Sequence, residues 1–275
     1  MTFEPTAAAD RARGEADSAA AKASVAVRQL ADRDECADGS ALLARIWGTQ
    51  LESAPFTGDV LTSLLHAGGC VLGAFDGPSM IGLTVGIAGA PKTDELYSMI
   101  AGVDAGHAGR GVGLALKLAQ RVWALEHGAT SMVWTFDPLI RRNAHFNINR
   151  LGARIEQYLP DFYPPMHDAL NRADLTDRLV AVWDLLAPRL RGPDPADATV
   201  VLRADADSEP VRSATAGTAW LVGTPRDIEA IRVQDATLAR RWRMSIREVM
   251  QDAQRSGHHI TGFTESGQYV LEQET

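Results

Sequence analysis

Glycines and an arginine separate a short apolar stretch, ending at Val103, from a longer one that begins at Val112. The connection ends in Ala108-Gly109-Arg110-Gly111-Val112-Gly113. The first backbone N–H groups of a helix have no intrahelical partner, glycine lets a ligand approach them, and the helix dipole adds positive charge. The segment therefore favours an anion site, with Arg110 and His107 as further donors. A glycine-rich turn without a ligand is the alternative, because short glycine motifs are weak evidence.

The segment matches neither of two familiar phosphate motifs. The pattern GxxxxGK[ST] is absent, and glycines at positions 106, 109, 111 and 113 do not form GxGxxG. A phosphate here would therefore be held by backbone amides and Arg110.

Two side chains further along the chain are candidates for proton transfer. Asp137 ends an apolar stretch that predicts a strand, and the ends of such strands are usual ligand positions. An aspartate there would orient an ammonium substrate or act as a base, although a turn-initiating Asp-Pro is equally consistent. His145 is the second candidate, because imidazole is the side chain most often used for proton transfer, although a lone histidine on a helix is more often structural or exposed. Asp137 and His145 are our catalytic candidates.

A short helix predicted over 142–150 carries polar side chains on one face. Asn143 and Asn147 are four residues apart, with His145 and Phe146 between them. Amide side chains at this spacing would line a ligand cleft and bond to ligand amides. Structural caps to nearby loops are the alternative.

Strands and helices that position these residues follow from the apolar periodicity. We predict strands over 25–30, 70–75, 80–88, 95–103, 131–137 and 179–185, and helices over 31–47, 56–66, 112–125 and 142–150. Three sequential strands followed by a strand–helix–strand crossover indicate an α/β fold with a mixed, largely antiparallel sheet flanked by helices. On the helix after the glycine loop, we expect Lys117, Gln120, Arg121 and Ala124 to form the outward face.

Composition divides the chain into four parts. Residues 1–24 have no strong apolar period and predict a disordered tail, and residues 25–186 form the main domain. Residues 187–215 are dense in Pro, Asp and Ala, which indicates a linker or excursion. Residues 216–275 predict an extra C-terminal α/β segment, with a helix over 225–253, that packs on the core.

Charge and cysteine content exclude several classes of protein. The net charge of −8 argues against broad nucleic-acid binding. The only cysteines, Cys36 and Cys70, lack CxxC spacing, so we expect no disulfide framework and no metal site. No apolar run approaches the roughly 20 residues that span a bilayer, and the N-terminus lacks a signal-peptide pattern. We therefore expect a cytoplasmic protein without membrane association.

The glycine loop between a strand and a helix, followed by another strand and helix, resembles the GNAT superfamily of acyl-CoA N-acyltransferases. In that family, Gln/Arg-x-x-Gly-x-Gly/Ala binds the pyrophosphate of acyl-CoA. The segment "WTFDPLIRRNAHFNINRLGARIEQYLPDFY" at 134–163 and the ending "GHHITGFTESGQYVLEQE" resemble a bacterial branch of predicted GNAT proteins. The fold resemblance covers residues 25–185, and the resemblance to the branch extends to the C-terminus.

This resemblance implies that acetyl-CoA, or another acyl-CoA, is the co-substrate. It implies pantetheine contacts at the strand end and in the following helix, and pyrophosphate contacts in the loop. The implied binding residues are Ile100, Ala101, Gly102 and Val103, then Ala108, Gly109, Arg110, Gly111, Val112 and Gly113, and finally Asn143 and Phe146.

Three departures from the family pattern bear on catalysis. Ala108 stands where the family has Gln or Arg. The family's frequent Asn-x-x-Ala-x-x-x-Tyr, anchored on Leu151-Gly152, reads Arg141, Ala144 and Ile148 here, so the tyrosine that often protonates the departing thiolate is missing. The strand over 96–103 also has no acidic residue in its middle.

The resemblance implies acetyl transfer from acetyl-CoA to the amine of a small metabolite by direct attack. A non-catalytic acyl-CoA-binding or ligand-sensing module is the first alternative. Another acyl-CoA reaction, such as hydrolysis or decarboxylation, is the second. The C-terminal segment either closes the acceptor pocket or forms a homodimer contact, and the sequence leaves both open.

Overall fold

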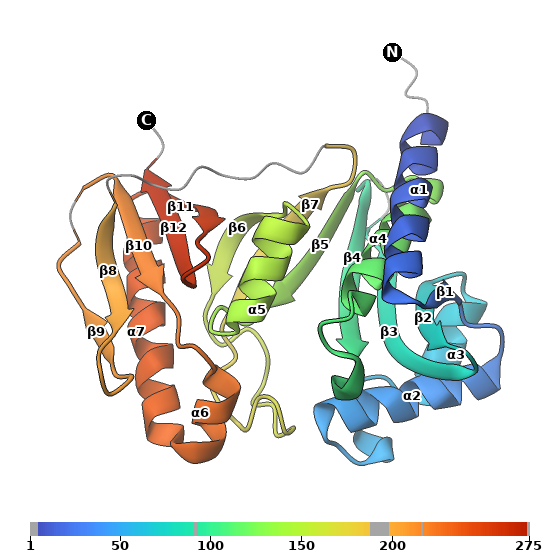
Figure 1. The fold of residues 1–275 in the computed structure, drawn as a ribbon, viewed down its shortest axis with the longest axis horizontal. Coiled ribbons are helices and arrows are strands. Elements are labelled where there is room, and N and C mark those ends of the chain that lie inside the picture. The colour runs from blue at the N-terminus through green and yellow to red at the C-terminus, as the bar shows by residue number, and fades with distance from the viewer. Residues whose placement is uncertain (1–4, 91–92, 188–197, 216, 274–275) are drawn as a thin grey trace. The chain divides into compact units, whose positions relative to one another are not determined.

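The computed structural model describes residues 5–90, 93–187, 198–215 and 217–273 (Figure 1). It is a mixed α/β protein, as predicted. The chain forms two compact units, the first comprising residues 1–133 and 184–186, and the second residues 134–183 and 187–275. The division falls inside a strand, whereas the sequence places a domain boundary at residue 186.

The first unit contains the predicted meander and crossover. Its elements are α1 (Pro5–Ala23), β1 (Ala26–Gln29), α2 (Arg33–Trp47), α3 (Gly58–His66), β2 (Cys70–Asp76), β3 (Ser79–Ala88), β4 (Glu95–Val103), α4 (Val112–Glu126) and the start of β5 (Ser131–Phe136). The strand order is β1-β2-β3-β4-β5. Strands β1 to β4 are antiparallel, and α4 connects β4 to the parallel strand β5.

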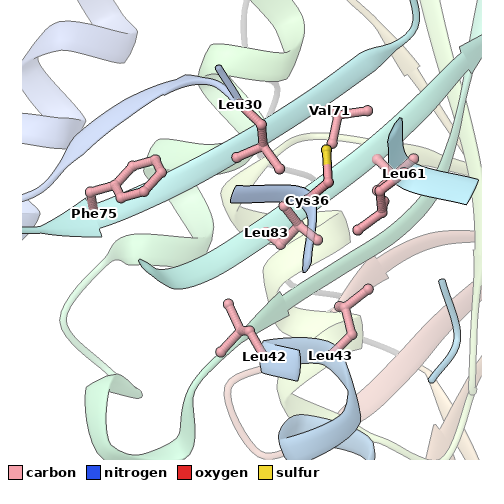
Figure 2. Packing of buried hydrophobic residues seen from close by; sticks show 9 residues of the cluster. Leu30, Cys36, Leu42, Leu43, Leu61, Val71, Phe75 and Leu83 are labelled. Atoms are coloured by element: carbon pink, nitrogen blue, oxygen red, sulfur yellow. The ribbon is translucent and has the colours of Figure 1, made fainter. Parts of the chain in front are cut away.

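Helices α2 and α3 pack on this sheet through a hydrophobic cluster (Figure 2). Figure 2 shows Leu42 and Leu43 of α2, Leu61 of α3, and Val71 and Leu83 of the sheet. Local signals fix the ends of α2. The Asp32 carboxylate accepts hydrogen bonds from the first free N–H groups, and Gly48 ends the helix in the left-handed conformation at φ +64°.

Residues 5–23 form helix α1, in contrast to the disordered tail predicted from the sequence. Ala8, Ala12 and Ala16 are buried, and α1 packs against α4. Alanine has the highest helix propensity, and small side chains at a spacing of four residues let two helices approach closely. The sequence prediction looked for large apolar residues and overlooked this alanine stripe. An ion pair of 3.0 Å joins Glu15 to Arg121 of α4.

The predicted outward face of α4 is wrong for the same reason. Lys117, Gln120, Arg121 and Ala124 are all buried. Helix α1 reaches Arg121, and Lys117 and Gln120 hydrogen-bond to Ser98 of β4. Neighbouring elements therefore cover two sides of α4, so that polar and apolar positions alike are enclosed.

The second unit contains two sheets. Its elements are the end of β5, α5 (Arg141–Ala144), a π-helical turn (His145–Arg150), β6 (Arg154–Leu159), β7 (Arg178–Asp184), β8 (Thr199–Ala204), β9 (Pro210–Arg212), β10 (Ala219–Gly223), α6 (Ile228–Gln234), α7 (Ala236–Arg255), β11 (His258–Phe263) and β12 (Gln268–Gln273). The strand orders are β5-β7-β6 and β11-β12-β10-β8-β9.

Two predictions for this unit need correction. Strands β8 and β9 lie within 187–215, where the sequence predicts a linker, and residues 188–197 of that range lie outside the described residues. The helix predicted over 225–253 is two helices, because Asp235 leaves the helical conformation after α6 and its carboxylate caps α7 at Leu238 N.

The C-terminal segment packs on residues 134–183 within the second unit. The Tyr269 hydroxyl donates to the Pro138 carbonyl at 2.7 Å, and Asn149 Nδ2 donates to the Phe263 carbonyl at 2.8 Å. Among the described residues, none of the helices is long and apolar enough to cross a membrane. The same residues contain no group of His, Cys, Asp and Glu side chains arranged to hold a metal ion.

Candidate functional site

One edge of strand β4 has a strand partner only as far as Tyr97. On one side it pairs with β3 from Leu96 to Val103. On the other side it pairs with β5 only at Glu95, Leu96 and Tyr97. No strand pairing among the described residues of the first unit covers the second edge beyond Tyr97. An edge with free backbone groups suits an extended ligand that carries amides.

The register of β4 is interrupted within this open stretch. Ile100 lies opposite Val85, and the next pair is Ser98 with Gly86, so Met99 is an extra residue. Such a bulge turns the backbone locally and frees a polar group from the ladder. Met99 is also among the exposed large hydrophobic residues of the described chain.

The four β4 residues predicted to bind pantetheine lie on this strand with different environments. Ile100 is half-buried, and its carbonyl accepts a hydrogen bond from the Thr84 hydroxyl at 2.9 Å. Gly102 is buried beneath Trp47 of α2, where a Cβ would lie 2.8 Å from the ring. Ala101 is exposed and Val103 half-buried. The glycine therefore serves the packing of α2, and only backbone groups at these positions remain for a ligand.

The glycine loop leads into a helix end without a side-chain cap. Gly109 and Gly111 have φ angles of +80° and +89°, a left-handed conformation that glycine adopts without strain. Gly111 is the N-cap of α4, and no side chain accepts from the first N–H groups there. Ala108 ends a short 3-10 turn in an extended conformation. The structure therefore brings unpartnered N–H groups and the positive end of a helix dipole together.

Gly113 in the first turn of α4 has free space where a side chain would stand. A Cβ there would have its nearest neighbour, Val103 Cγ2, at 3.9 Å. Its backbone is helical, so neither packing nor conformation requires a glycine. A ligand that approaches the N–H groups of Val112 and Gly113 closely would require one.

Arg110, predicted as the cation of the loop, is engaged with the protein. Its guanidinium forms an ion pair of 3.0 Å with Asp76 at the end of β2 and lies 3.4 Å from the Ala23 carbonyl. The pair is partly exposed, so water weakens it. Arg110 thus holds the loop to β2 and α1, and its remaining donors are free to face an anion.

The residues predicted on the helix after β5 belong to the second unit. Asn143 and Phe146 are half-buried, and His145 is exposed at the start of the π-helical turn. Asn147 is buried, and its carbonyl accepts from Ala153 N at 2.9 Å. Roles for Asn143, His145 and Phe146 remain predictions.

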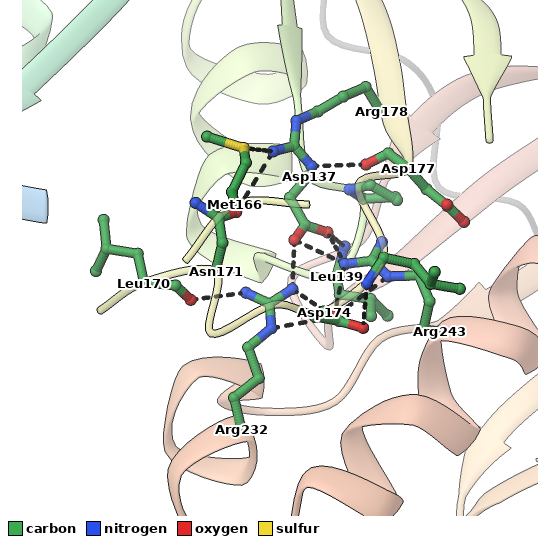
Figure 3. A network of polar contacts seen from close by, with 12 residues as sticks. Asp137, Leu139, Met166, Leu170, Asn171, Asp174, Asp177, Arg178, Arg232 and Arg243 are labelled. Carbon is green, nitrogen blue, oxygen red and sulfur yellow. Dashed lines mark hydrogen bonds and ion pairs between the residues drawn. The ribbon is translucent and has the colours of Figure 1, made fainter. Parts of the chain in front are cut away.

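Asp137, predicted as a base, instead lies in a buried network of charges (Figure 3). Its carboxylate contacts Arg232 at 2.5 Å and Arg243 at 2.8 Å, and both arginines also contact Asp174. Burial opposes ionisation, but Arg243 and then Arg232 outweigh it and hold the pKa of Asp137 well below its usual range. A carboxylate enclosed by two guanidiniums does not accept a proton near neutral pH. Its role is structural: it joins the end of β5 to α6 and α7.

Neither the position of the missing tyrosine nor Tyr158 supplies a mobile acid. Ile148, at that position, is buried. The Tyr158 hydroxyl donates to Asp177, and burial together with that carboxylate raises the pKa of Tyr158. Tyr158 is therefore a structural donor rather than a mobile acid.

Lys117 of α4 is buried, although the sequence predicts that its side chain is exposed. Lys117 Nζ donates to Ser98 Oγ at 2.6 Å and to Gln120 Oε1 at 3.2 Å, and it lies 3.6 Å from Met132 Sδ. Burial lowers the pKa of Lys117 to about 7. Two of these contacts are with β4 and β5, so the periodicity of the helix gave no signal for the burial of this lysine.

We expect Lys117→Met to remove a pH dependence of stability. In the unfolded chain lysine has a pKa of about 10.4, so between pH 7 and that value the unfolded state binds more protons. The free energy of unfolding of the wild type should therefore rise with pH across this interval. Urea unfolding of both proteins between pH 7 and 8.5 measures the difference between their free energies of unfolding. This difference should shrink as pH rises. A constant difference would contradict the lowered pKa.

Comparison with known proteins finds similarity in structure only. No protein-family model matches the sequence, and no curated protein matches it. Several solved GNAT acetyltransferases are similar in structure. The ribosomal-protein-S18-alanine N-acetyltransferase of Escherichia coli is 12% identical, with a TM-score of 0.48, over 60% of this chain and 96% of its own.

Two further structures give the same result. A GNAT-family acetyltransferase from Streptococcus pneumoniae is 14% identical, with a TM-score of 0.48, over 57% of this chain and 97% of its own. The yncA protein of Salmonella typhimurium, solved with its cofactor acetyl-CoA, is 17% identical, with a TM-score of 0.47, over 62% and 98%.

Proposed function

We propose that the chain binds acyl-CoA at the open edge of β4 and the uncapped start of α4, and transfers the acyl group to the amine of a small metabolite. One observation carries the proposal: α4 begins at Gly111 without a side-chain cap, and Gly113 leaves open space in front of its first N–H groups. The resemblance of the sequence to GNAT enzymes supports it.

The residues present fit the proposed ligand. The pyrophosphate would accept from the N–H groups at the start of α4, where the helix dipole favours negative charge. The pantetheine amides would pair with the open edge of β4 beyond Tyr97, as an added strand does. Arg110 would add a screened attraction for phosphate at the edge of the loop.

The chain's own contribution to the chemistry would be positioning and polarisation. A backbone N–H freed by the bulge at Met99 would donate to the thioester oxygen and stabilise the negative charge that develops on it. The amine nitrogen forms the new bond to the acyl carbon as the carbon–sulfur bond breaks. One proton leaves the amine and one reaches the thiolate, both through water, because Asp137 is ion-paired and Ile148 replaces the tyrosine.

A non-catalytic acyl-CoA-binding module is the second candidate. The observation in its favour is that Asp137 and Tyr158 are held in structural contacts. Such a module would keep the loop and the strand edge and would release no thiol.

Thiol release from acetyl-CoA across a panel of small amines distinguishes these functions. An acyltransferase releases free CoA in proportion to acylated amine, and the product mass identifies the acceptor. Thiol release without an acylated product would indicate hydrolysis or decarboxylation instead. Saturable binding without release across the panel would favour the module, and the absence of binding would reject both functions.

Arg110→Ala is expected to weaken acetyl-CoA binding by up to about fivefold, because an exposed charge interaction contributes up to roughly 1 kcal/mol. The loss should shrink as salt rises, since ions screen it. Asp76→Asn is the matched test, because it releases Arg110 from its ion pair and should leave affinity equal or higher. Calorimetry at two salt concentrations measures both. Equal losses of acetyl-CoA affinity in the two variants would mean that Arg110 acts only by holding the loop through its ion pair with Asp76.

A further inference from the structure

The second unit contains a pocket that the proposed acyl transfer does not use. Its volume is about 440 Å³, and its walls come from α5, the loop before α6, and helices α6 and α7. Arg141 and Arg226 supply cations, Thr224 and Ser208 supply polar atoms, and Ala230 and Ile231 supply apolar surface, with the buried Trp242 also in the lining. No residue of the first unit lines it.

Arg141 is held in a fixed orientation. Its Nε lies 3.2 Å from Thr224 Oγ1, and its Nη2 donates to the Thr224 carbonyl at 2.5 Å. The Thr224 hydroxyl donates in turn to the Gly267 carbonyl at 2.7 Å. A Cβ on Gly267 would collide with the guanidinium, so the tight turn between β11 and β12 leaves room for Arg141. These bonds leave donors of Arg141 available to a ligand.

Arg226 brings a second positive charge to the same pocket. It is exposed, and it makes no hydrogen bond or ion pair with the residues that the structure describes. Burial lowers the pKa of Arg141, and the charge of Arg226 lowers it further, which places the two guanidiniums within electrostatic reach of one another.

The carboxylate in the lining of this pocket already accepts a hydrogen bond from the protein. Asp227 also lines the pocket, but its side chain accepts the Ala230 N–H at 3.0 Å and caps α6. Two like charges at one pocket repel each other, and an anion between them would remove that cost.

The remaining wall is apolar and rigid. Trp242 is buried, and its indole N–H donates to the Ser208 carbonyl at 2.8 Å, so the ring cannot turn freely. Ala230 and Ile231 supply the apolar surface. A preformed wall of this kind binds a flat apolar group at a low cost in conformational entropy.

We propose that this pocket binds a small organic anion, with its carboxylate or phosphate between Arg141 and Arg226 and its apolar body against the half-buried side chains of Ala230 and Ile231. The site is separate from the acyl-CoA function and does not depend on it. A carboxylate and a phosphate share the chemistry that two guanidiniums recognise, and two probes distinguish them.

Calorimetry of the full chain with benzoate and with phenyl phosphate tests the site. We expect saturable binding of at least one probe, weaker binding of acetate and inorganic phosphate, and none of benzyl alcohol. Arg226→Gln should lower the affinity for the probe that binds about tenfold, because it removes one charged donor. Arg150→Gln is the matched control, because Arg150 is also an exposed arginine of the second unit but does not line the pocket. Thermal unfolding should show both variants folded.

Three outcomes would overturn the proposal. The first is that neither aromatic anion binds up to its solubility limit. The second is that the Arg226→Gln variant binds the probe as tightly as the Arg150→Gln variant does. The third is that benzyl alcohol binds as tightly as the anions. Displacement of the probe by CoA would show that the pocket is a part of the acyl-CoA site and not a second one. The Gly113→Leu variant should bind the probe normally, so failure of the acyl-CoA proposal is distinguishable from failure of this one.

Discussion

Asp137→Asn is expected to lower the free energy of unfolding by about 3–5 kcal/mol, the cost of breaking a buried ion pair by removing one partner. Asp137 is 4% exposed and Arg243 is fully buried. The neutral amide would leave Asp174 as the remaining carboxylate in contact with both Arg232 and Arg243. Urea unfolding followed by circular dichroism measures the change.

Asp161→Asn is the matched control for this variant. Asp161 also pairs with an arginine, Arg247, at 2.7 Å, but its side chain is half exposed. An exposed pair contributes about 0–1 kcal/mol, so the control should be nearly neutral. Equal effects of the two substitutions would contradict the role assigned to burial.

The effect of Asp137→Asn should depend on pH in a defined direction. The pKa of Asp137 is held below its usual range, so the stabilisation is fully present above the unfolded value of about 3.9. It is lost as pH falls through the lower folded value. Wild type and variant should therefore differ most above pH 4 and converge in acid. If Asp137 were the catalytic base instead, the variant would lose turnover per folded molecule and keep its stability.

Gly113→Leu is expected to weaken acetyl-CoA binding about a hundredfold or more. A side chain there would cover the N–H groups at the start of α4, and each hydrogen bond to a charged group contributes about 1.5–3 kcal/mol. A Cβ at Gly113 would make only an ordinary contact, with Val103 Cγ2 at 3.9 Å, so the fold does not oppose a side chain at this position. Stability should be equal or higher, because leucine favours a helix more than glycine does. Calorimetry and thermal unfolding report the two effects separately.

Gly14→Leu in α1 is the control for this substitution. Gly14 is an exposed helical glycine, and a Cβ there would meet no heavy atom within 4 Å. The variant should gain helix propensity and bind acetyl-CoA as the wild type does. Unchanged affinity of Gly113→Leu would remove the loop from the proposed site. A loss of affinity in both variants would point to a general effect on the first unit.

Local sequence signals determined the elements of the first unit from β1 to β5, but not helix α1. The predicted bounds of β4 agree with the structure, because alternating apolar residues and flanking turn residues act within a few positions. The glycine loop was found in the same way, since positive φ angles at Gly109 and Gly111 require glycine whatever surrounds them. The strand order, an antiparallel meander followed by a crossover, then followed from the rule that sequential strands joined by short connections usually lie side by side.

The tertiary structure decided what depends on partners distant in the chain. Asp137 reads as a strand-end carboxylate in the sequence, yet Arg232 and Arg243, about a hundred positions later, make it a structural ion. Lys117 reads as exposed in the sequence, yet it contacts Ser98 of β4 and Met132 of β5, and Arg141 and Arg226 share a pocket that no sequence spacing indicates. Periodicity and turn preferences act over a few residues, whereas burial and charge pairing depend on which segments meet. The sequence alone therefore determined the strands and helices from β1 to β5 and the glycine loop, and the packing determined the charge state and role of these side chains.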